Sequence, residues 1–438
     1  MQPHGGELPR APSPHSDTLT QTLNDWLELL ERRHPRQIEL GLERVARVRD
    51  AARLAPSFPC IVVGGTNGKG STCAMLEAML ANAGFRVGTY TSPHLLRYNE
   101  RVRVGLREAD DAALVRAFER IESVRGEVPL TYFEFGTLAA LDLFQRSAVD
   151  VAVLEVGLGG RLDAVNAFDA ECAVVTTIDL DHMDYLGTTR EAIGFEKAGI
   201  FRRGRPAVCA DEDPPRSLLA HADASGAELR LIGRDFGYRV GPHDWHYWSA
   251  RGRRSGLPHP ALRGEYQIAN ASAAIAALET LRDKLPVDMG AVRRALVEVS
   301  LPGRFQVLPG RPQVILDVGH NPQAARALAA SLAAMPRAGR TLAVFGMLAD
   351  KDLQSVAAAM CPAVDQWFAC SLPGPRGAGA QQVLAAIEHV RADASVECCE
   401  DPAAAYARAK EVARDDDRIV VFGSFYTVSG VMRAGDVE

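Results

Sequence analysis

A glycine-rich segment with a single lysine is the strongest chemical feature of the sequence. It reads GGTNGKGS at 64–71 and follows the short apolar run 61–63. Glycines let backbone N–H groups turn toward an anion, and the N-terminus of a following helix adds partial positive charge. Lys69 would reach the β- and γ-phosphates of a nucleotide, and Ser71 would be available to a Mg²⁺ ion. The segment therefore predicts a phosphate-binding loop.

The segment departs from the general phosphate-loop pattern at two positions. Val63 stands where the first glycine is expected, and Gly70 separates Lys69 from Ser71. The general pattern alone leaves open a glycine-rich strand-to-helix turn with a solvated lysine.

Three other side chains could do chemistry, but each has an ordinary alternative. Glu155 ends an apolar run and precedes a glycine-rich turn, where a carboxylate would suit Mg²⁺ or serve as a helix cap or ion-pair partner. His182, between Asp181 and Met183, could equally be a hydrogen-bonded histidine after a strand. Lys197 falls on a predicted helix, where solvated or paired lysines are common.

The elements that must position these residues alternate between short strands and longer helices. This alternation predicts an α/β fold with a mostly parallel sheet covered by helices on both faces. Helices should begin near Lys69, Asp110 and Thr188. Predicted strands are 61–63, 87–90, 151–156, 173–176 and 207–209.

Two later segments divide the chain. Residues 231–260 mix Trp and Tyr with Gly, Pro and Arg, which predicts a small antiparallel insertion; its three histidines, at 243, 246 and 259, lack metal-ligand spacing. A helix should follow at 267–281. A second alternation then predicts a strand at 314–317, a helix at 323–334 and strands at 341–345 and 418–422. We expect a disordered leader at 1–18, an ATP-binding domain at 19–300, a linker at 301–311 and a smaller Rossmann-like domain at 312–438.

Composition narrows the class of protein. The net charge of −6 gives no global basic field for nucleic acid or an anionic membrane. No apolar run reaches the roughly 18 to 20 residues that span a bilayer, and no secretory signal is visible. The eight cysteines form no C-x-x-C pair, which favours reduced thiols in a cytoplasmic protein.

The variant TNGKGS at 66–71 resembles the loop of the Mur ligase and folylpolyglutamate synthase superfamily. The resemblance covers about residues 20–435 and is greatest to the bacterial bifunctional dihydrofolate synthase/folylpolyglutamate synthases. One departure is Gly319, where family members often carry Ala. The motifs that carry the resemblance lie at 38–44, 91–94, 131–134, 154–163, 181–182, 196–200, 301–305 and 317–322.

The resemblance implies a site for ATP and two Mg²⁺ ions, with no organic redox cofactor. Ser92 and Glu155 would hold the first metal ion, and His182 with Glu155 the second. Lys197 would be carbamylated. His320 would face the γ-phosphate or a metal, with capping of the following helix as the alternative. Lys69, His182, Lys197 and His320 would be catalytic, and the residues implied to bind ATP are Thr66, Asn67, Gly68, Lys69, Gly70, Ser71, Asn270, Arg304 and Asp317.

The resemblance also implies a pocket for dihydropteroate or folate. For Phe133 the alternative is plain core packing. The implied pocket residues are Glu39, Leu40, Gly41, Leu42, Thr131, Tyr132, Phe133, Glu134, Leu162, Asp163 and Ala164.

The expected activity is ATP-dependent formation of an amide bond between a carboxylate and L-glutamate, by a monomer that takes only small-molecule substrates. A Mur-type ligase of UDP-linked peptides is one alternative, although the residues before the loop, 1–63, are few for its UDP-binding domain. A P-loop ATPase or regulatory nucleotide-binding protein is the other. It would explain the loop but not the remaining motifs.

Overall fold

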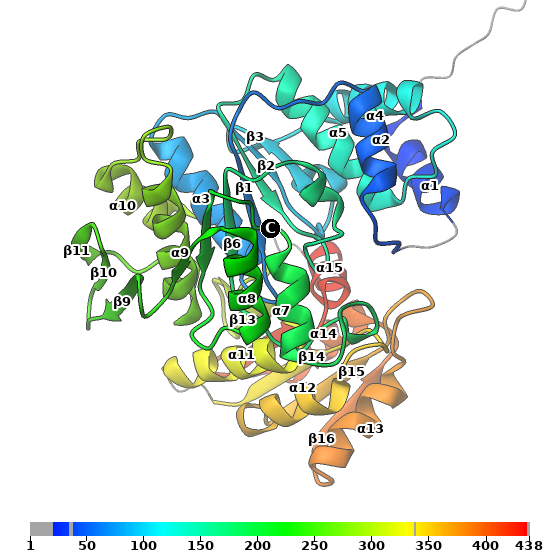
Figure 1. Ribbon diagram of the computed structural model, residues 1–438. Helices are drawn as coiled ribbons and strands as arrows, with labels where there is room; N and C mark the ends of the chain where they lie inside the picture. The colour runs from blue at the N-terminus through cyan, green and yellow to red at the C-terminus, as the bar shows by residue number, and fades with distance from the viewer. Residues whose placement is uncertain (1–20, 35–37, 337–338, 436–438) are drawn as a thin grey trace, which may run out of the picture.

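The computed structural model describes residues 21–34, 38–336 and 339–435. The leader predicted at 1–18 lies outside these residues. The described part of the chain folds into two α/β domains, one built on an eight-stranded sheet and the other on a six-stranded sheet (Figure 1). This confirms the predicted fold class.

The N-terminal sheet has the strand order β4-β3-β2-β5-β1-β6-β7-β8. Strands β2, β5, β1, β6, β7 and β8 run parallel, and β3 and β4 continue the sheet antiparallel at one edge. The central strands are buried on both faces, as their unbroken apolar runs predict. The strand bounds are β1 Cys60–Gly64, β2 Val87–Tyr90, β3 Val102–Val104, β4 Arg107–Glu108, β5 Val151–Glu155, β6 Cys172–Val175, β7 Pro206–Cys209 and β8 Glu228–Leu231.

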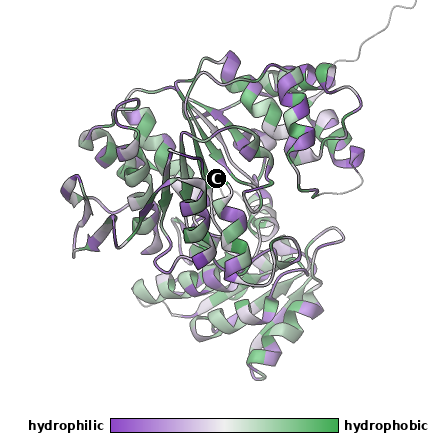
Figure 2. Ribbon diagram, in the orientation of Figure 1, coloured by the Kyte–Doolittle hydropathy of each residue, from purple (hydrophilic) through white to green (hydrophobic). Residues whose placement is uncertain are grey.

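Helices cover both faces of this sheet and enclose a separate apolar core on each. Three predicted helix starts agree with the structure, since α3 begins at Lys69 and the side chains of Asp110 and Thr189 cap α4 and α7. Figure 2 shows hydrophobic colour along the strands of this sheet. The helix bounds are α1 Leu23–Arg33, α2 Glu43–Ala51, α3 Lys69–Asn82, η1 Tyr98–Arg101, α4 Asp111–Arg125, α5 Tyr132–Arg146, η2 Ala164–Ala167, α6 Met183–Leu186, α7 Arg190–Ala198, α8 Arg216–Ser225, α9 Tyr266–Thr280 and α10 Met289–Glu298.

The predicted insertion is a three-stranded antiparallel sheet of β9 (Phe236–Val240), β10 (Trp245–Ser249) and β11 (Gly252–Leu257). Trp245 and Tyr247 are fully buried and join the core that contains α9. Within the described ranges, no group of three or more His, Cys, Asp or Glu side chains could hold a metal ion, the histidines of this insertion included.

The C-terminal sheet has the order β12-β13-β17-β14-β15-β16 and is parallel except for β12. Strand β12 lies inside the segment predicted as a linker and pairs with β13, so the second sheet begins within that segment. The strands are β12 Gln306–Leu308, β13 Gln313–Asp317, β14 Thr341–Phe345, β15 Gln366–Cys370, β16 Ser395–Cys399 and β17 Arg418–Phe422. The helices are α11 Pro322–Ala334, α12 Leu353–Met360, η3 Cys361–Ala363, α13 Ala380–Val390, α14 Pro402–Val412 and α15 Phe425–Ala434.

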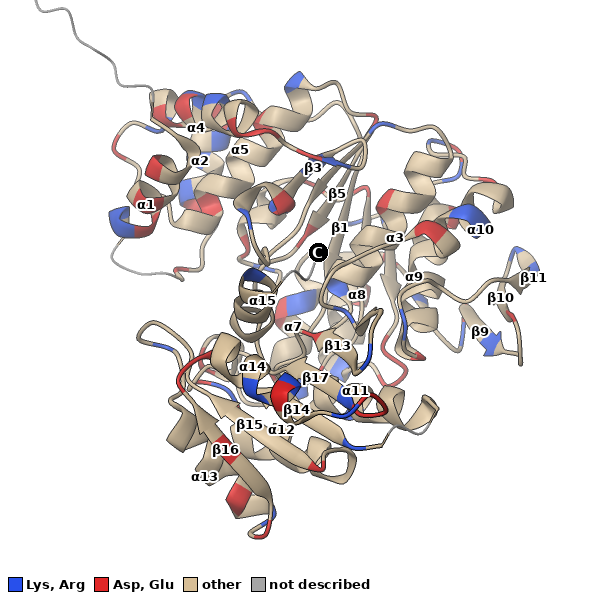
Figure 3. Cartoon of the chain, turned by 180° about the vertical axis from the view of Figure 1, so that it is seen from behind, with Lys and Arg blue, Asp and Glu red and all other residues tan. Residues whose placement is uncertain are grey.

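The surface chemistry follows the composition. Lys and Arg are interspersed with Asp and Glu over both domains (Figure 3). None of the eight cysteines is in a disulfide. None of the described helices has the length and apolar character needed to span a membrane.

Candidate active site

The phosphate loop connects the end of β1 to the start of α3, and two of its glycines cannot be replaced without strain. Gly65 and Gly68 have positive φ angles of 142° and 87°. A Cβ at Gly65 would lie 1.8 Å from Thr176 Oγ1, and one at Gly68 would lie 2.5 Å from Asn270 Oδ1. The loop therefore needs glycine both for its turn and for its close packing.

Lys69 folds back over this loop. Its Nζ donates to the carbonyl oxygens of Gly65 and Thr66, each at 3.1 Å. The Thr66 hydroxyl anchors the loop to the segment after β6 by donating to Asp179 O at 3.0 Å. The ammonium group is thus held above the loop on backbone carbonyls, where a phosphate oxygen could receive it.

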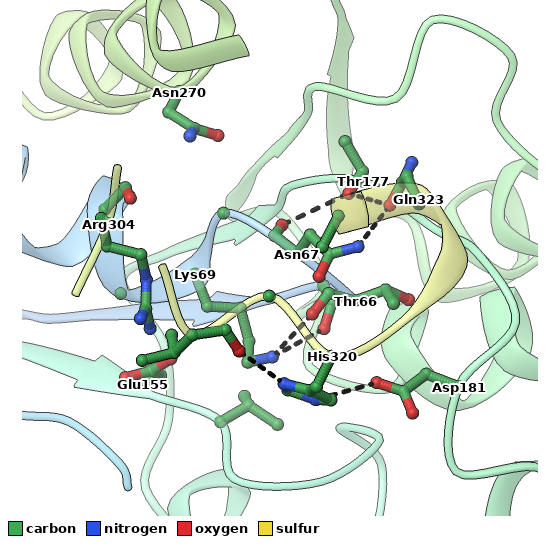
Figure 4. Close-up of a pocket in the computed structure, with 18 of the residues that line it drawn as sticks. Thr66, Asn67, Lys69, Glu155, Thr177, Asp181, Asn270, Arg304, His320 and Gln323 are labelled. Carbon is green, nitrogen blue, oxygen red and sulfur yellow. Dashed lines mark hydrogen bonds and ion pairs between the residues drawn. The ribbon is translucent and has the colours of Figure 1, made fainter. Parts of the chain in front are cut away.

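A cavity of about 290 Å³ opens beside the loop and is lined by both domains (Figure 4). Every residue predicted to bind ATP or metal, or to be catalytic, lines this one cavity. They are Thr66, Asn67, Gly68, Lys69, Gly70, Ser71, Ser92, Glu155, His182, Lys197, Asn270, Arg304, Asp317 and His320.

Glu155 stands at the carboxyl end of β5, where ligand sites of parallel sheets lie. It is only 4% exposed, and its Oε2 accepts from Ser92 N at 3.0 Å. Burial raises the pKa of Glu155, and the charge of Lys69 opposes that rise.

This donor set fits a Mg²⁺ ion that is bound largely through a nucleotide. Glu155 supplies one hard carboxylate and Ser92 a neighbouring hydroxyl, both on the cavity wall. Since no group of three or more His, Cys, Asp or Glu in the described ranges could hold a metal alone, phosphate oxygens and water would have to complete the shell. Mg²⁺ is commonly bound in that way.

Asp181 is the centre of an ionic cluster across the cavity. Lys351 Nζ donates to its Oδ1, and His320 Nε2 and His182 Nε2 lie 3.7 and 4.0 Å from its Oδ2. Although burial opposes it, the neighbouring His320 and the charge of Lys351 hold the pKa of Asp181 below its usual range.

His182 adopts a left-handed backbone conformation with φ of 50°. Burial lowers the pKa of its imidazole to about 4, although Asp181 opposes this. The imidazole is therefore neutral near pH 7, the form that can coordinate a metal. The alternative that His320 caps the next helix is wrong, because Asn321 Oδ1 accepts the Ala324 N–H at 2.9 Å and is the N-cap of α11.

Lys197 is neither solvated nor paired with a carboxylate on α7. It is 3% exposed, and its Nζ donates to Gly65 O at 2.8 Å. Burial, and then the neighbouring charge of Lys69, lower its pKa to about 7. The ordinary interpretation of this residue as a surface lysine is wrong.

The C-terminal domain closes the cavity with Asp317, Arg304 and Phe425. Asp317 Oδ2 accepts from Phe305 N at 2.9 Å, and Oδ1 accepts from Gly319 N at 2.7 Å. The Arg304 guanidinium lies over the Phe425 ring, 5.1 Å from its centroid. Across the cavity, Asn270 donates to Gln267 Oε1 at 3.0 Å, and Gln267 donates to Ser71 Oγ at 3.3 Å.

The residues predicted for a pteroate pocket come together, but outside this cavity. Gly41 N donates to Leu162 O at 3.2 Å. Arg44 joins two of the motifs by pairing with Glu39 at 2.7 Å and Glu134 at 2.8 Å. The lining of the 290 Å³ cavity includes none of the predicted pocket residues at 39–42, 131–134 and 162–164.

Several members of this group hold the local structure. Thr131 caps α5 in a reciprocal capping box with Glu134. Asp163 accepts from Leu158 N and Val165 N at 2.8 and 3.0 Å, and burial raises its pKa to about 7. Phe133 packs on the backbone of Gly157, where a Cβ would lie 2.6 Å from its Cζ. Because Gly157 lines the cavity, Phe133 places this group directly beside it.

Among the polar residues at the cavity and its mouth that were not predicted are Lys351, Gln323 and Thr177. Lys351 contacts Asp181, and Gln323 accepts from Asn67 at 2.6 Å and from Thr177 at 3.3 Å. Lys351 and Thr177 follow the carboxyl ends of β14 and β6, the edge where ligands bind in open parallel sheets. Their position shortly after a strand was the only feature of the sequence that could have indicated a role for these two residues at the site.

Two family models match the chain. The Mur ligase middle domain matches residues 63–278, and the Mur ligase glutamate ligase domain matches residues 303–425. The dihydrofolate synthase/folylpolyglutamate synthase of Escherichia coli K12 is 46% identical over 419 residues, which are 95% of this chain and 96% of that protein.

Solved structures extend the similarity to the whole fold. FolC of E. coli in complex with DHPP and ADP has a TM-score of 0.91 and 45% identity, covering 95% of this chain and 98% of that one. A bifunctional folylpolyglutamate synthase/dihydrofolate synthase with Mn, AMPPNP and L-glutamate bound has a TM-score of 0.88 and 44% identity, with the same coverage. These similarities confirm the resemblance drawn from the motifs.

Proposed function

This chain belongs to the dihydrofolate synthase/folylpolyglutamate synthase family of Mur ligases, and from that premise we propose its reaction. It is an ATP-dependent ligase that couples L-glutamate to dihydropteroate, giving dihydrofolate, and to reduced folates, giving folylpolyglutamates. The observation that carries the proposal is the single cavity in which the phosphate loop faces charged residues of both domains.

The chemistry begins with a carboxylate, whose oxygen is a poor leaving group. The carboxylate oxygen attacks the γ-phosphorus of ATP, and the bond from that phosphorus to the bridging oxygen of the β-phosphate breaks. The products of this step are ADP and an acyl phosphate. The α-amine of glutamate then attacks the acyl carbon through a tetrahedral intermediate, loses a proton and expels phosphate. Lys69, held on the loop carbonyls, stabilises charge on the transferring group.

Two Mg²⁺ ions would neutralise phosphate charge when bound. We propose that Ser92 and Glu155 hold one, and that Glu155 and His182 hold the other. In support, all three line the cavity and the His182 imidazole is neutral near pH 7. A carbamylated Lys197 would turn a buried amine beside the loop into an anion that supports the second ion.

The pteroate end of the substrate is assigned to the group of motifs around Arg44. Ranges 39–42, 131–134 and 162–164 meet there, next to the cavity through Phe133 and Gly157. We propose that the protein acts on small molecules as a monomer in the cytoplasm.

The decisive experiment offers dihydropteroate and tetrahydrofolate in separate reactions with ATP, Mg²⁺ and L-glutamate, and identifies products by mass. Addition of one glutamate to each acceptor is expected. ADP release that needs neither acceptor nor glutamate would instead identify an ATPase, and a product from only one acceptor would remove the other activity.

A further inference from the structure

The side chain of Asn67, in the middle of the phosphate loop, is hydrogen-bonded to residues of the C-terminal domain. Its Nδ2 donates to Asn321 Oδ1 at 3.1 Å and to Gln323 Oε1 at 2.6 Å. Its Oδ1 accepts from Asn321 Nδ2 at 3.0 Å. Figure 4 shows Asn67 and Thr177 both directed at Gln323.

This arrangement uses the whole donor capacity of the amide. A carboxamide has two N–H donors and one carbonyl acceptor, and all three groups are engaged here. Its backbone carbonyl is also taken, by the hydroxyls of Thr176 at 2.6 Å and Thr177 at 3.3 Å. While the domains stay in this position, the Asn67 side chain has no N–H left for a phosphate.

The partners come from the start of α11 in the C-terminal domain. Asn321 is the N-cap of α11, is 3% exposed and also donates to Asp181 Oδ2 at 3.4 Å. Gln323 lies in the first turn of the same helix. A movement of α11 away from the loop would therefore break the contacts to Asn67 and to Thr177 together.

We propose that the side chain of Asn67 is a docking contact for the C-terminal domain rather than a nucleotide ligand, which leaves its backbone N–H to the phosphate loop, and that Asn321 and Gln323 are positioning residues. They set the phosphate loop when the domains close, so that phosphoryl transfer proceeds only in a cavity from which water is excluded. This inference rests on the proposed ligase function, because it assigns the amide cluster a role in protecting the acyl phosphate.

The test compares Gln323→Met, which keeps side-chain length without the acceptor, with Gln323→Glu, which keeps the acceptor. Gln323→Met should lower kcat for amide formation about tenfold, the loss expected for one hydrogen bond of about 1.4 kcal/mol, with the KM for ATP changed less than about twofold. The ratio of phosphate released to amide formed should rise. Gln323→Glu should recover most of the coupling.

A double-mutant cycle separates docking from nucleotide binding. Asn67→Ala should reproduce the effect of Gln323→Met, and the double variant should be no worse than the poorer single variant. Arg326→Ala is the matched control, because Arg326 crosses the same interface from α11 to Asp179 but is exposed and touches no loop side chain. It should behave like the wild type.

Contrary results are equally defined. If Asn67→Ala raises the KM for ATP tenfold or more while Gln323→Met has no effect, Asn67 is a nucleotide ligand and the inference is wrong. The inference would also be wrong if the losses of the two single variants multiplied in the double variant.

Small-angle scattering with a non-hydrolysable ATP analogue tests the docking without catalysis, and it should show a larger radius of gyration for Gln323→Met than for the wild type. A wild-type protein that makes no amide would refute the proposed function, but the scattering comparison would still decide the docking.

Discussion

Two lysines meet at one backbone carbonyl in the active site. The Nζ atoms of Lys69 and Lys197 donate to Gly65 O at 3.1 and 2.8 Å. Lys197 is buried, and burial together with the neighbouring charge of Lys69 lowers its pKa to about 7. Near neutral pH a fraction of Lys197 is therefore the uncharged amine, the form that can act as a nucleophile.

Lys69→Ala is expected to reduce both ligase activities by at least about 10²- to 10³-fold, the usual cost of removing one preorganised donor at a developing charge. The folded structure should persist, because the lysine makes only two bonds to the loop. Product formation and circular dichroism measure the two effects. Lys284→Ala, which removes an exposed lysine paired with Glu171, is the matched control. Near-normal product formation by folded Lys69→Ala would exclude the predicted role.

Lys197 should react with CO₂ to form a carbamate, and the reaction should depend on pH. Only the neutral amine is nucleophilic, so below its pKa of about 7 the lysine is protonated and carbamate should be lost, whereas above that pKa it should accumulate. Carbon-13 bicarbonate and NMR would detect the carbamate carbon. The signal should be absent in Lys197→Ala and present in Lys284→Ala. An equal signal in both variants would mean that another amine is labelled.

Among elements, the sequence predicted those whose local signals agree. The helix α3 begins directly after Gly68, and α4 begins after a capping Asp110. Strands β1, β2, β5, β6 and β7 were predicted from their apolar runs because both faces are buried, whereas β3, β4 and β8 at the edges of that sheet, and β15 and β16 of the second sheet, were not predicted. Strand β12 was missed because its three half-buried residues, next to a Pro- and Gly-rich segment, have a linker's composition.

The Thr131–Glu134 motif shows how one pattern carries two meanings. Its resemblance implied substrate contacts, but Thr and Glu three residues apart before an apolar run also predict a capping box, which the structure contains. A capping role does not exclude a substrate role, and stability and KM separate the two.

Thr131→Ala should lower the free energy of unfolding by about 1 kcal/mol through loss of the α5 cap, and Thr131→Ser should restore it. Asp401→Ala removes the N-cap of α14 in the other domain and should cost a similar amount. Denaturant unfolding and the KM for dihydropteroate are measured for all three variants. If Thr131 also contacts pteroate, its Ala variant alone raises that KM. Equal KM values would leave Thr131 with only its structural role.

At the scale of the whole molecule, the shared cavity was beyond the reach of periodicity. Asn67 contacts Gln323 across 256 residues and Lys351 contacts Asp181 across 170. Such contacts depend on how two sheets with separate cores are oriented, and no local pattern encodes that orientation. The ATP-binding, metal-binding and catalytic residues implied by family resemblance did converge on one cavity, whereas the implied pteroate residues lie beside it. Gln323 and Lys351, which reach the site only through domain packing, were not predicted.

One apolar side chain connects this packing to the active site. Leu95 lies three residues after Ser92, in the N-terminal domain. Its side chain is nevertheless buried with Val314, Leu316 and Val428 in a core of the C-terminal domain. Three residues earlier, the Ser92 N–H donates to Glu155 Oε2 at 3.0 Å. The segment 92–95 is therefore held at Ser92 by Glu155, the carboxylate proposed above to bind metal, and at Leu95 by the core of the C-terminal domain.

Leu95→Ala should destabilise the protein by about 2 kcal/mol or more, because it leaves a cavity in that core. It should also lower kcat, since the loop that carries Ser92 loses its attachment to the C-terminal domain. Leu96→Ala is the matched control, because Leu96 is 37% exposed where Leu95 is 8% exposed, and its loss should change stability by less than about 0.5 kcal/mol. Thermal unfolding and steady-state kinetics measure both effects. A Leu95→Ala protein with reduced stability but unchanged kcat would contradict this prediction. The core of the C-terminal domain would then be damaged without any effect on the placement of Ser92, so the core and the segment 92–95 would be independent.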